Sequence, residues 1–382
     1  MQKAALILSL TFAASTALAG TAEVTGTAPK EKSALEKLWD LPVLYKNDRN
    51  PVIEEFDFTG RFQLDYFNVE SDKGDRSFTE IRRFRLGMDS WWANRHLQVK
   101  ATVDTNLRTY AAPEVFYQRF TDLFMKIHVN DAVNVRVGKF EPHFGFDREF
   151  SDNLQKTFER SFYDDQLIGG GDYIAGVEVS GKVGAWGYLA AVYSTNVNKE
   201  FGDFDGGQAY QAEISYDFSK RLGCEKALWV LDYLHADGKN ANTNVFANYN
   251  NAAATYFDFQ KGRFSLVTQF AYGNGISIKG DTYEFMVMPA WKITPKLEVV
   301  ARYQLGLSSK ANGITTLNRQ EKTVGNFTGD EYNAPYVGLN YYLHGQKMKI
   351  MIGEQYANLG GGTGPKAGYS GWTTLVGFRI FW

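Results

Sequence analysis

Arginines recur at alternate positions of several strand-like segments, on the face that the alternation makes polar. An arginine carries a permanent charge and a planar fork of N–H donors, so it can replace water around the oxygens of a phosphate-like anion. A row of such side chains could therefore line a path for anions. Arg82 lies next to the loop end of its segment and could turn toward the same side. The predicted members of this polar face are Arg61, Arg83, Arg85, Arg136, Arg302 and Arg379.

Carboxylates occupy the same polar face and allow a second interpretation. Residues 208–218 offer Gln211, Glu213 and Asp217, where an anion path would favour more arginine. Opposite charges could pair sideways, which would leave a field across the interior but little net preference for anions. For each arginine, pairing within the protein and contact with a passing ion therefore stay open as alternatives. The further carboxylates predicted on this face are Asp65, Asp104, Glu178, Asp232, Glu284 and Glu298.

The elements that would position these side chains are β-strands. From residue 54 onward the hydrophobic period is two, as where Phe56, Phe58 and Phe62 alternate with polar neighbours. This period is typical of a strand with one apolar and one polar face. The pattern predicts sixteen strands, at residues 54–69, 80–91, 96–105, 115–129, 133–140, 172–182, 186–195, 208–218, 227–235, 252–260, 263–273, 281–292, 296–306, 335–343, 347–357 and 371–382.

The two ends of the chain indicate a bacterial outer-membrane β-barrel. Trp372, Val376 and Trp382 belong to one apolar face of the last strand, which runs to the final residue. In a membrane barrel one face of each strand meets lipid and the other meets a polar interior. At the other end, Lys3 precedes an apolar run and Ala17-Leu18-Ala19 resembles a secretory cleavage site. We therefore expect a signal peptide at residues 1–19 and an all-β fold, a transmembrane antiparallel barrel.

Composition agrees with a barrel at residues 54–382. Aromatic residues make up 15% of the chain and there are only 9 prolines, as expected for aromatic girdles and strands that tolerate little proline. The formal net charge of −2 gives no indication of nucleic-acid binding. Residues 20–53 are charged, with Leu35, Leu38 and Trp39 on one helical face, so we expect a periplasmic segment with a short helix. It could be a tethered leader, a plug or a partner contact.

Short and long connections alternate between the predicted strands. The gaps at residues 130–132 and 261–262 are short, whereas those at 141–171 and 307–334 are long. Short periplasmic turns that alternate with long outer loops are typical of an even-stranded outer-membrane barrel. The alternation favours sixteen strands and places both barrel termini in the periplasm.

Catalysis has little support in the sequence. The five histidines are scattered, none in a His-x-x-x-His or His-x-Glu spacing, so neither zinc nor another cofactor is expected. No Gly-x-Ser-x-Gly elbow occurs. His143, in a Pro-His-Phe corner, is the one candidate, and a packed or pore-lining imidazole is favoured there. The alternative function is a barrel enzyme that acts on lipid or peptide through a loop-borne site, because such sites assemble in space.

Four stretches resemble the family of phosphate-selective porins O and P. They are GRFQLDY at residues 60–66, EIRRFRLG at 80–87, VRVGKFEPHFG at 135–145 and TFERS at 157–161. The resemblance implies a sixteen-stranded homotrimeric porin in outer-membrane lipid, whose third outer loop folds inward and narrows the pore. Charges of both signs in residues 141–171 would make such a constriction sensitive to ion charge.

The resemblance also implies which residues meet an anion such as phosphate. Arg61 and the pair Arg82-Arg83 match the family pattern best, and Arg160 and Lys139 are added because they lie near the third loop. Since carboxylates share the face, we expect a passive channel for small hydrophilic solutes and ions. General or weakly anion-preferring diffusion is favoured over phosphate specificity.

Overall fold

The structure, a computed structural model, describes residues 34–105, 107, 116–164, 166, 173–195, 200–201, 207–237, 249–276, 279–316 and 319–382. The chain forms two compact units, Met1–Asp40 and Leu41–Trp382. The described part of the first contains helix α1 (Ala34–Leu38), within the stretch predicted to hold a short helix. None of the helices in the described residues is long and apolar enough to cross a membrane.

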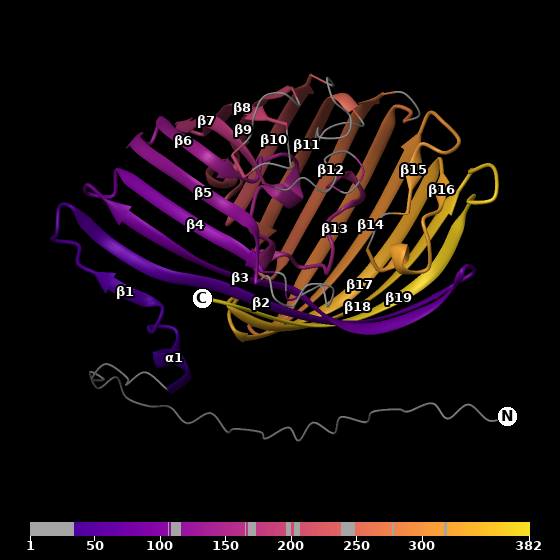
Figure 1. Ribbon diagram of the computed structural model, residues 1–382, viewed down its shortest axis with the longest axis horizontal. Coiled ribbons are helices and arrows are strands. Elements are labelled where there is room, and N and C mark those ends of the chain that lie inside the picture. Colours follow the sequence, from indigo (N-terminus) through magenta and orange to yellow (C-terminus); the bar gives the residue numbers. More distant parts are fainter. Residues whose placement is uncertain are drawn as a thin grey trace. The chain divides into compact units, whose positions relative to one another are not determined.

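The second unit is a closed barrel of sixteen antiparallel strands, as the sequence predicts (Figure 1). Each strand pairs with the next along the chain, and β19 pairs with β2 to close the ring. The first eight barrel strands are β2 (Ile53–Ser71), β3 (Gly74–Trp92), β4 (Leu97–Thr105), β5 (Tyr117–Asn130), β6 (Val133–Phe140), β7 (Ile174–Val183), β8 (Trp186–Ser194) and β9 (Gln208–Asp217). The others are β10 (Lys226–Ala236), β11 (Tyr249–Lys261), β12 (Phe264–Gly275), β13 (Thr282–Thr294), β14 (Leu297–Ser308), β17 (Glu331–His344), β18 (Met348–Gly360) and β19 (Tyr369–Phe381).

Small elements decorate the connections. The turn between β9 and β10 contains α2 (Ser219–Leu222), which ends at Gly223 in the left-handed conformation that glycine adopts readily. The remaining elements are β1 (Val43–Lys46), which pairs with β2, the two-stranded ribbon β15 (Ile314–Thr315) and β16 (Thr328–Gly329), and the 3-10 turns η2 (Phe146–Arg148), η3 (Asp152–Leu154) and η6 (Glu321–Thr323).

Side chains alternate between the two faces of the wall. In β17, Val337 and Leu339 are exposed on the outside, whereas Tyr336 and Asn340 are buried on the inside. The ladder between β17 and β18 skips Ala334 and Pro335, since proline has no N–H to donate. The strand begins at Glu331, four residues before the start that the sequence pattern predicts.

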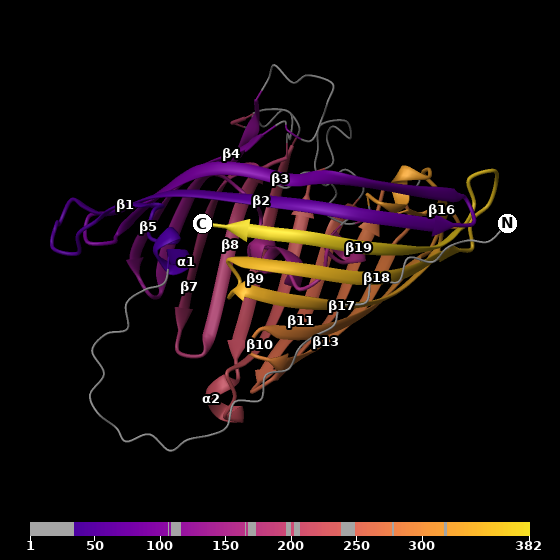
Figure 2. The same ribbon diagram turned by 90° about the horizontal axis from the view of Figure 1, so that it is seen from below.

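The last residue seals the barrel. Trp382 and Gly60 exchange backbone hydrogen bonds of 3.0 and 3.1 Å, beyond the end of β19. A Cβ on Gly60 would lie 2.3 Å from the Trp382 ring, so only glycine lets the indole lie across β2. β2, β3 and β19 lie side by side in the wall (Figure 2). The apolar end of the chain is thus part of the closing seam.

The β2–β3 hairpin is longer than the alternation predicts. The pairing continues to Ser71 opposite Gly74, where the sequence predicts a loop at residues 70–79. Phe67 and Phe78 pack edge to face with ring centroids 3.8 Å apart and hold this extension together. Gly74, with φ of 129°, makes the tight turn.

Candidate functional site

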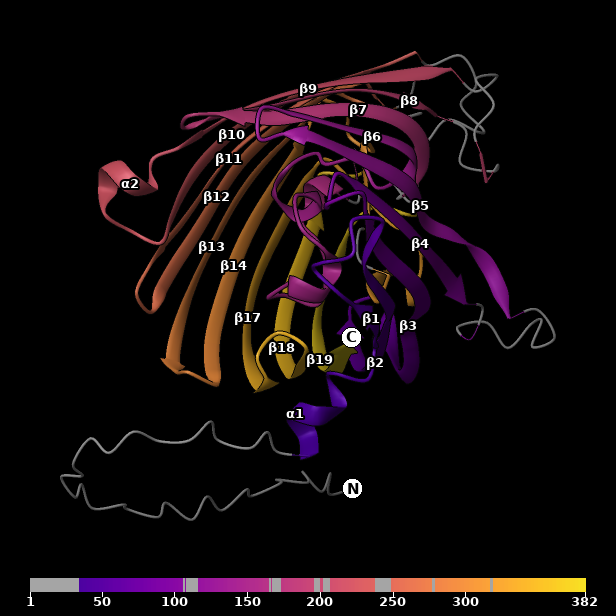
Figure 3. The same cartoon turned by 90° about the vertical axis from the view of Figure 1, so that its left-hand side faces the viewer.

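The chain leaves the wall after β6 and crosses the barrel interior (Figure 3). We call residues 141–164 the inward segment. Its backbone donates hydrogen bonds to side chains of the far wall, on β10, β12 and β14. These bonds run from the N–H of Gly145 to Asp232 (2.9 Å), of Phe146 to Gln269 (2.8 Å) and of Phe162 to Gln304 (2.7 Å).

One side of the inward segment is apolar and fills part of the lumen. Phe146 packs against Phe150 and Tyr256, with ring centroids 4.9 and 5.7 Å apart. Phe158 belongs to the same buried cluster, which includes Met286 of β13. Burial of each large side chain is worth roughly 1.5–3 kcal/mol, so this packing fixes the segment against the β10–β14 wall.

The opposite side of the inward segment carries a carboxylate among four arginines. Asp152 Oδ2 lies 3.4 Å from Arg61, 3.2 Å from Arg83 and 4.0 Å from Arg85. Its other oxygen lies 2.5 Å from Arg160 of the same segment. Burial alone would raise the pKa of Asp152, but these four guanidinium groups hold that pKa well below its usual range. The structure therefore brings together four of the predicted anion-path residues, around a charge of the protein itself.

A β-bulge turns Arg82 inward beside Arg83. Gln63 of β2 faces Arg83, the next pair is Leu64 with Ile81, and Arg82 is the extra residue. Its Nη2 lies 3.4 Å from Glu159 of the inward segment. Burial would raise the pKa of Glu159, but Arg82 and the other donors around it lower that pKa far below its usual value.

Arg319, in the connection between β14 and β17, joins the same network. It lies 2.9 Å from Glu159 and 3.1 Å from Asp65, and it also pairs with Glu80. Asp65 in turn pairs with Arg379 of β19. The predicted lumen residue Arg379 therefore faces inward and is neutralised there.

Further cations hold the middle of the inward segment. Buried Arg302 of β14 donates from Nη1 to Thr157 Oγ1 at 3.1 Å and to the Glu159 carbonyl at 2.8 Å. Lys349 of β18 donates to a backbone carbonyl of the segment, that of Gln155, at 2.5 Å. Arg302 thus lies where the alternation predicts, and it binds protein oxygens.

Two predicted arginines also have partners on the wall itself. Arg85 also donates to Tyr173 at 2.7 Å and lies 3.4 Å from Asp104. Arg136 pairs with Glu178 of β7. Both arginines are buried and oriented by these partners.

Lys139 lies elsewhere than predicted. In the register between β5 and β6, Gly138 lies opposite Phe124, whose side chain points into the lumen beside Arg136. Lys139 is the next residue and lies opposite Leu123, so its side chain points to the other face. Lys139 therefore belongs to the outer face, and its Nζ lies 2.6 Å from Glu200. Proximity to the third loop does not decide which face a strand residue occupies, so the anion-path prediction for Lys139 is corrected.

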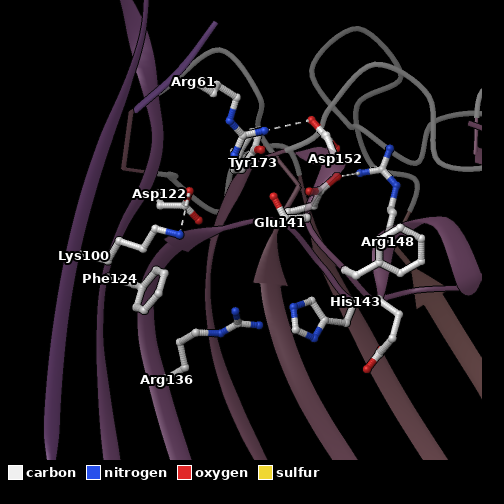
Figure 4. Close-up of a pocket in the computed structure, with 13 residues that line it drawn as sticks. Arg61, Lys100, Asp122, Phe124, Arg136, Glu141, His143, Arg148, Asp152 and Tyr173 are labelled. Carbon is white, nitrogen blue, oxygen red and sulfur yellow. Dashed lines mark hydrogen bonds and ion pairs between the residues drawn. The ribbon is translucent and has the colours of Figure 1, made fainter. Parts of the chain in front are cut away.

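The space left beside the inward segment is a chain of cavities. Cavities of about 150 and 160 Å³ share Arg61 and Lys100. The second of these shares Arg136, His143 and Glu149 with a larger cavity of about 630 Å³. Arg136 and His143 point toward each other across the close-up in Figure 4. These cavities follow the polar side of the segment, along the wall from β2 to β9, and a further cavity of about 270 Å³ lies on its other side, beside Phe146 and Met288.

Burial shifts the pKa values of His143 and Glu149, two of the titratable groups of the inward segment that line these cavities. It lowers the pKa of His143 to about 4, with Arg136 acting in the same direction, so the imidazole is neutral at pH 7. Burial raises the pKa of Glu149 to about 7. A neutral imidazole beside a guanidinium lines the passage and carries no charge of its own.

Sequence reasoning missed several contacts of the inward segment. Arg319 lies in a connection with no periodic pattern, and Lys349 lies on a strand where only arginines were considered. The inward position of Lys349 could have been predicted from alternation, because Lys349 is two residues from Met351, which is buried inside the barrel. Arg319 had no such signal.

The model of one protein family, phosphate-selective porin O and P, matches residues 56–357. A search of curated proteins gives no match. Among solved structures, the chain is similar to an anion-selective porin from Comamonas acidovorans, with a TM-score of 0.58, 11% identity and coverage of 86% of this chain and 99% of that one. It is also similar to OprB of Pseudomonas putida (TM-score 0.60, 12% identity, 86% and 94% covered) and to OmpF of Salmonella typhi in complex with daunomycin (0.60, 11%, 88% and 99%). At such identities these likenesses show the fold.

Proposed function

Because this chain belongs to the family of phosphate-selective porins O and P, we propose that it is a general outer-membrane pore with only a weak preference for anions. The family and the sixteen-stranded barrel make it an outer-membrane channel. They point to passage of solutes and away from enzymatic turnover. The solutes are small and hydrophilic, since the cavities beside the inward segment are lined by charged and polar residues.

The observation that carries the weak selectivity is the pairing of the lumen arginines. Asp152 pairs with Arg61 and Arg83 and offsets part of their charge, Glu159 binds Arg82, and Asp65 binds Arg379. A passing phosphate would have to compete with these fixed carboxylates for the same N–H donors. The arginines still line the passage, which supports a modest excess of anion flow over cation flow.

The test is the reversal potential of the purified porin in a planar bilayer under a KCl gradient, repeated with phosphate. We expect a small shift toward the chloride potential and no loss of current at millimolar phosphate. Strong anion selectivity with block by low phosphate would contradict the proposal, because it would mean that the arginines bind phosphate in spite of their partners. Absence of any conductance would contradict the channel itself.

We further propose that three copies assemble and that both barrel termini face the periplasm, after cleavage of residues 1–19. The even number of strands puts both ends of the barrel at the rim with the short turns, which is the periplasmic rim in such proteins. Cys224, the one cysteine of the chain, lies in a turn at that rim. A polymer-linked maleimide too large for the pore should label it only after the outer membrane is permeabilised. Labelling in intact cells would reverse the orientation, and an unheated sample that migrates as a monomer would contradict the trimer.

A further inference from the structure

The cavity of about 270 Å³ lies between the inward segment and the wall from β10 to β13. Phe146 and Phe150 line it from the segment, and Met288 of β13 lines it from the wall. Lys226, which also lines it, is the first residue of β10 and its side chain is 43% exposed. The cavity therefore reaches the rim of the barrel that carries the short turns.

Part of the cavity lining is aromatic and apolar. The rings of Phe146 and Phe150 pack edge to face with centroids 4.9 Å apart. Met288 and Val267 of the wall are buried beside them. Water fills such a space poorly, because these side chains offer it no hydrogen bonds. Phenylalanine rings and a methionine thioether both make favourable contacts with an aromatic ring, so this part of the cavity suits an aromatic body.

A buried amide without an acceptor lines the same cavity. Gln155 is 6% exposed, and its Nε2 has no hydrogen-bond partner in the described structure. Its backbone carbonyl accepts from Lys349 at 2.5 Å, so the residue is held through its main chain while its side-chain amide stays available. An unsatisfied buried N–H costs free energy that an acceptor on a bound solute would recover.

The next residue, Lys156, supplies a second donor to the cavity. Its Nζ donates to Ser265 at 2.7 Å and to Glu298 at 3.0 Å. An ammonium group has three N–H bonds, so one remains without an acceptor among the described residues. The Lys156 carbonyl accepts from Asn340 at 2.9 Å, which fixes the main chain at this position as well.

The acidic residues that line the cavity already have partners. Asp258 is 2.5 Å from Lys226, so these two charges offset each other near the rim. Asp147 turns to its own segment, where its Oδ2 accepts from the Ser161 N–H at 2.6 Å. The N–H groups that remain unused are therefore those of Gln155 and Lys156, and two neighbouring donors match the two oxygens of a carboxylate.

We propose that this cavity binds small aromatic carboxylates. The ring lies against Phe146, Phe150 and Met288, and the carboxylate accepts from Gln155 Nε2 and Lys156 Nζ. The volume is close to the lower limit of small-molecule sites, roughly 300 Å³, so a single ring suits it better than a larger solute. Inorganic phosphate has no apolar body to fill the space. This inference rests on the proposed function, because a solute reaches the cavity through the channel.

The first test is isothermal titration calorimetry with sodium benzoate on the full-length porin in lipid nanodiscs, which keep detergent out of the apolar cavity. Empty nanodiscs correct for benzoate that enters the lipid. Benzoate should bind saturably. Sodium acetate, which has no ring, and benzyl alcohol, which has no carboxylate, should each bind at least tenfold more weakly. Excess sodium phosphate should leave benzoate binding unchanged.

The second test uses variants of the inward segment. Gln155→Leu should weaken benzoate binding roughly tenfold, because a hydrogen bond to a charged acceptor is lost. The variant should be at least as resistant to heat as the wild type, since it removes an unsatisfied buried amide. Leu154→Trp places an indole in the cavity from a position that is 41% exposed, so it should abolish binding in a folded barrel. The matched control is Asn153→Leu, whose side chain lines the cavity of about 150 Å³ on the other side of the segment. It should retain benzoate binding.

The outcomes separate the site from the channel. A conducting porin that gives no benzoate heat overturns the site, leaves the proposed function intact and means that the cavity holds water only. Equal affinity for benzoate, acetate and benzyl alcohol, or equal losses in Gln155→Leu and Asn153→Leu, also overturns the site. Benzoate binding in a protein that does not conduct supports the site and contradicts the channel.

Discussion

The walls on the two sides of the inward segment use charge in opposite ways. On the β2–β3 side, every guanidinium of the group Arg61, Arg82 and Arg83 has a carboxylate of the segment within 3.4 Å. On the β9–β10 side, Glu213 and Asp232 face each other without a cationic partner among the described residues. The arginines of the first wall form ion pairs that hold the inward segment in place. The two carboxylates of the second wall form no such ion pairs in the described structure.

The largest expected effect comes from reversal of charge on the first wall. Arg82→Glu combined with Arg83→Glu puts two carboxylates beside Glu159 and Asp152, so the inward segment should be repelled from β3. We expect a reversal potential shifted clearly toward cations and a larger, noisier conductance. The measurement is made in a planar bilayer under a KCl gradient.

The matched control reverses two charges on the exposed β2–β3 turn, Lys73→Glu with Arg76→Glu. It should change selectivity much less, because that turn lies outside the network around Asp152. Equal shifts of the reversal potential in both double variants would mean that selectivity depends on the total charge of the protein and not on the ion pairs around Asp152.

A smaller effect is expected from acid. Asp152 and Glu159 have pKa values lowered in the folded state, so their pairing stabilises the fold above the ordinary carboxyl pKa of about 4 and is lost only as pH falls through the lowered values. The groups that face them are arginines, chiefly Arg83 and Arg160 for Asp152 and Arg82 and Arg319 for Glu159. Single-channel conductance should therefore show no step between pH 5 and pH 4 from these two carboxylates, whereas Glu149, whose pKa is raised to about 7, titrates above that range. A step in conductance near pH 5 would show that these carboxylates titrate normally and do not hold the segment.

The smallest effect is expected at Lys139. Lys139→Met removes an ion pair between the buried Lys139 ammonium and the partly exposed Glu200 on the outer face, so we expect lower stability of the folded barrel and unchanged selectivity. The first is measured as the temperature at which the folded band disappears on a gel, and the second as reversal potential. A shift in selectivity would return Lys139 to the anion path.

Alternation predicted the wall well because each strand has a lipid face and a lumen face that differ in polarity. It placed Arg136, Arg302 and Arg379 inside. Lys139 is three residues from Arg136, an odd number, so alternation alone predicts that Lys139 lies outside. The prediction for Lys139 used its position near the third loop instead. Arg82 breaks the alternation through a bulge that no local pattern reveals. The partners of the inward segment, such as Arg319, come from connections far along the chain, so only the folded structure brings them together.

The central claim is that ion pairs to the first wall hold the inward segment and so set the size of the pore. The most direct test compares the single-channel conductance of Asp152→Asn with that of Asp258→Asn, since both remove one lumen carboxylate. Asp152→Asn should leave four guanidinium groups without their shared partner, at a cost of roughly 3–5 kcal/mol for a broken buried pair, and should raise the conductance and its noise. Asp258→Asn should leave both near the wild-type values. Equal conductance in the two variants would contradict the account.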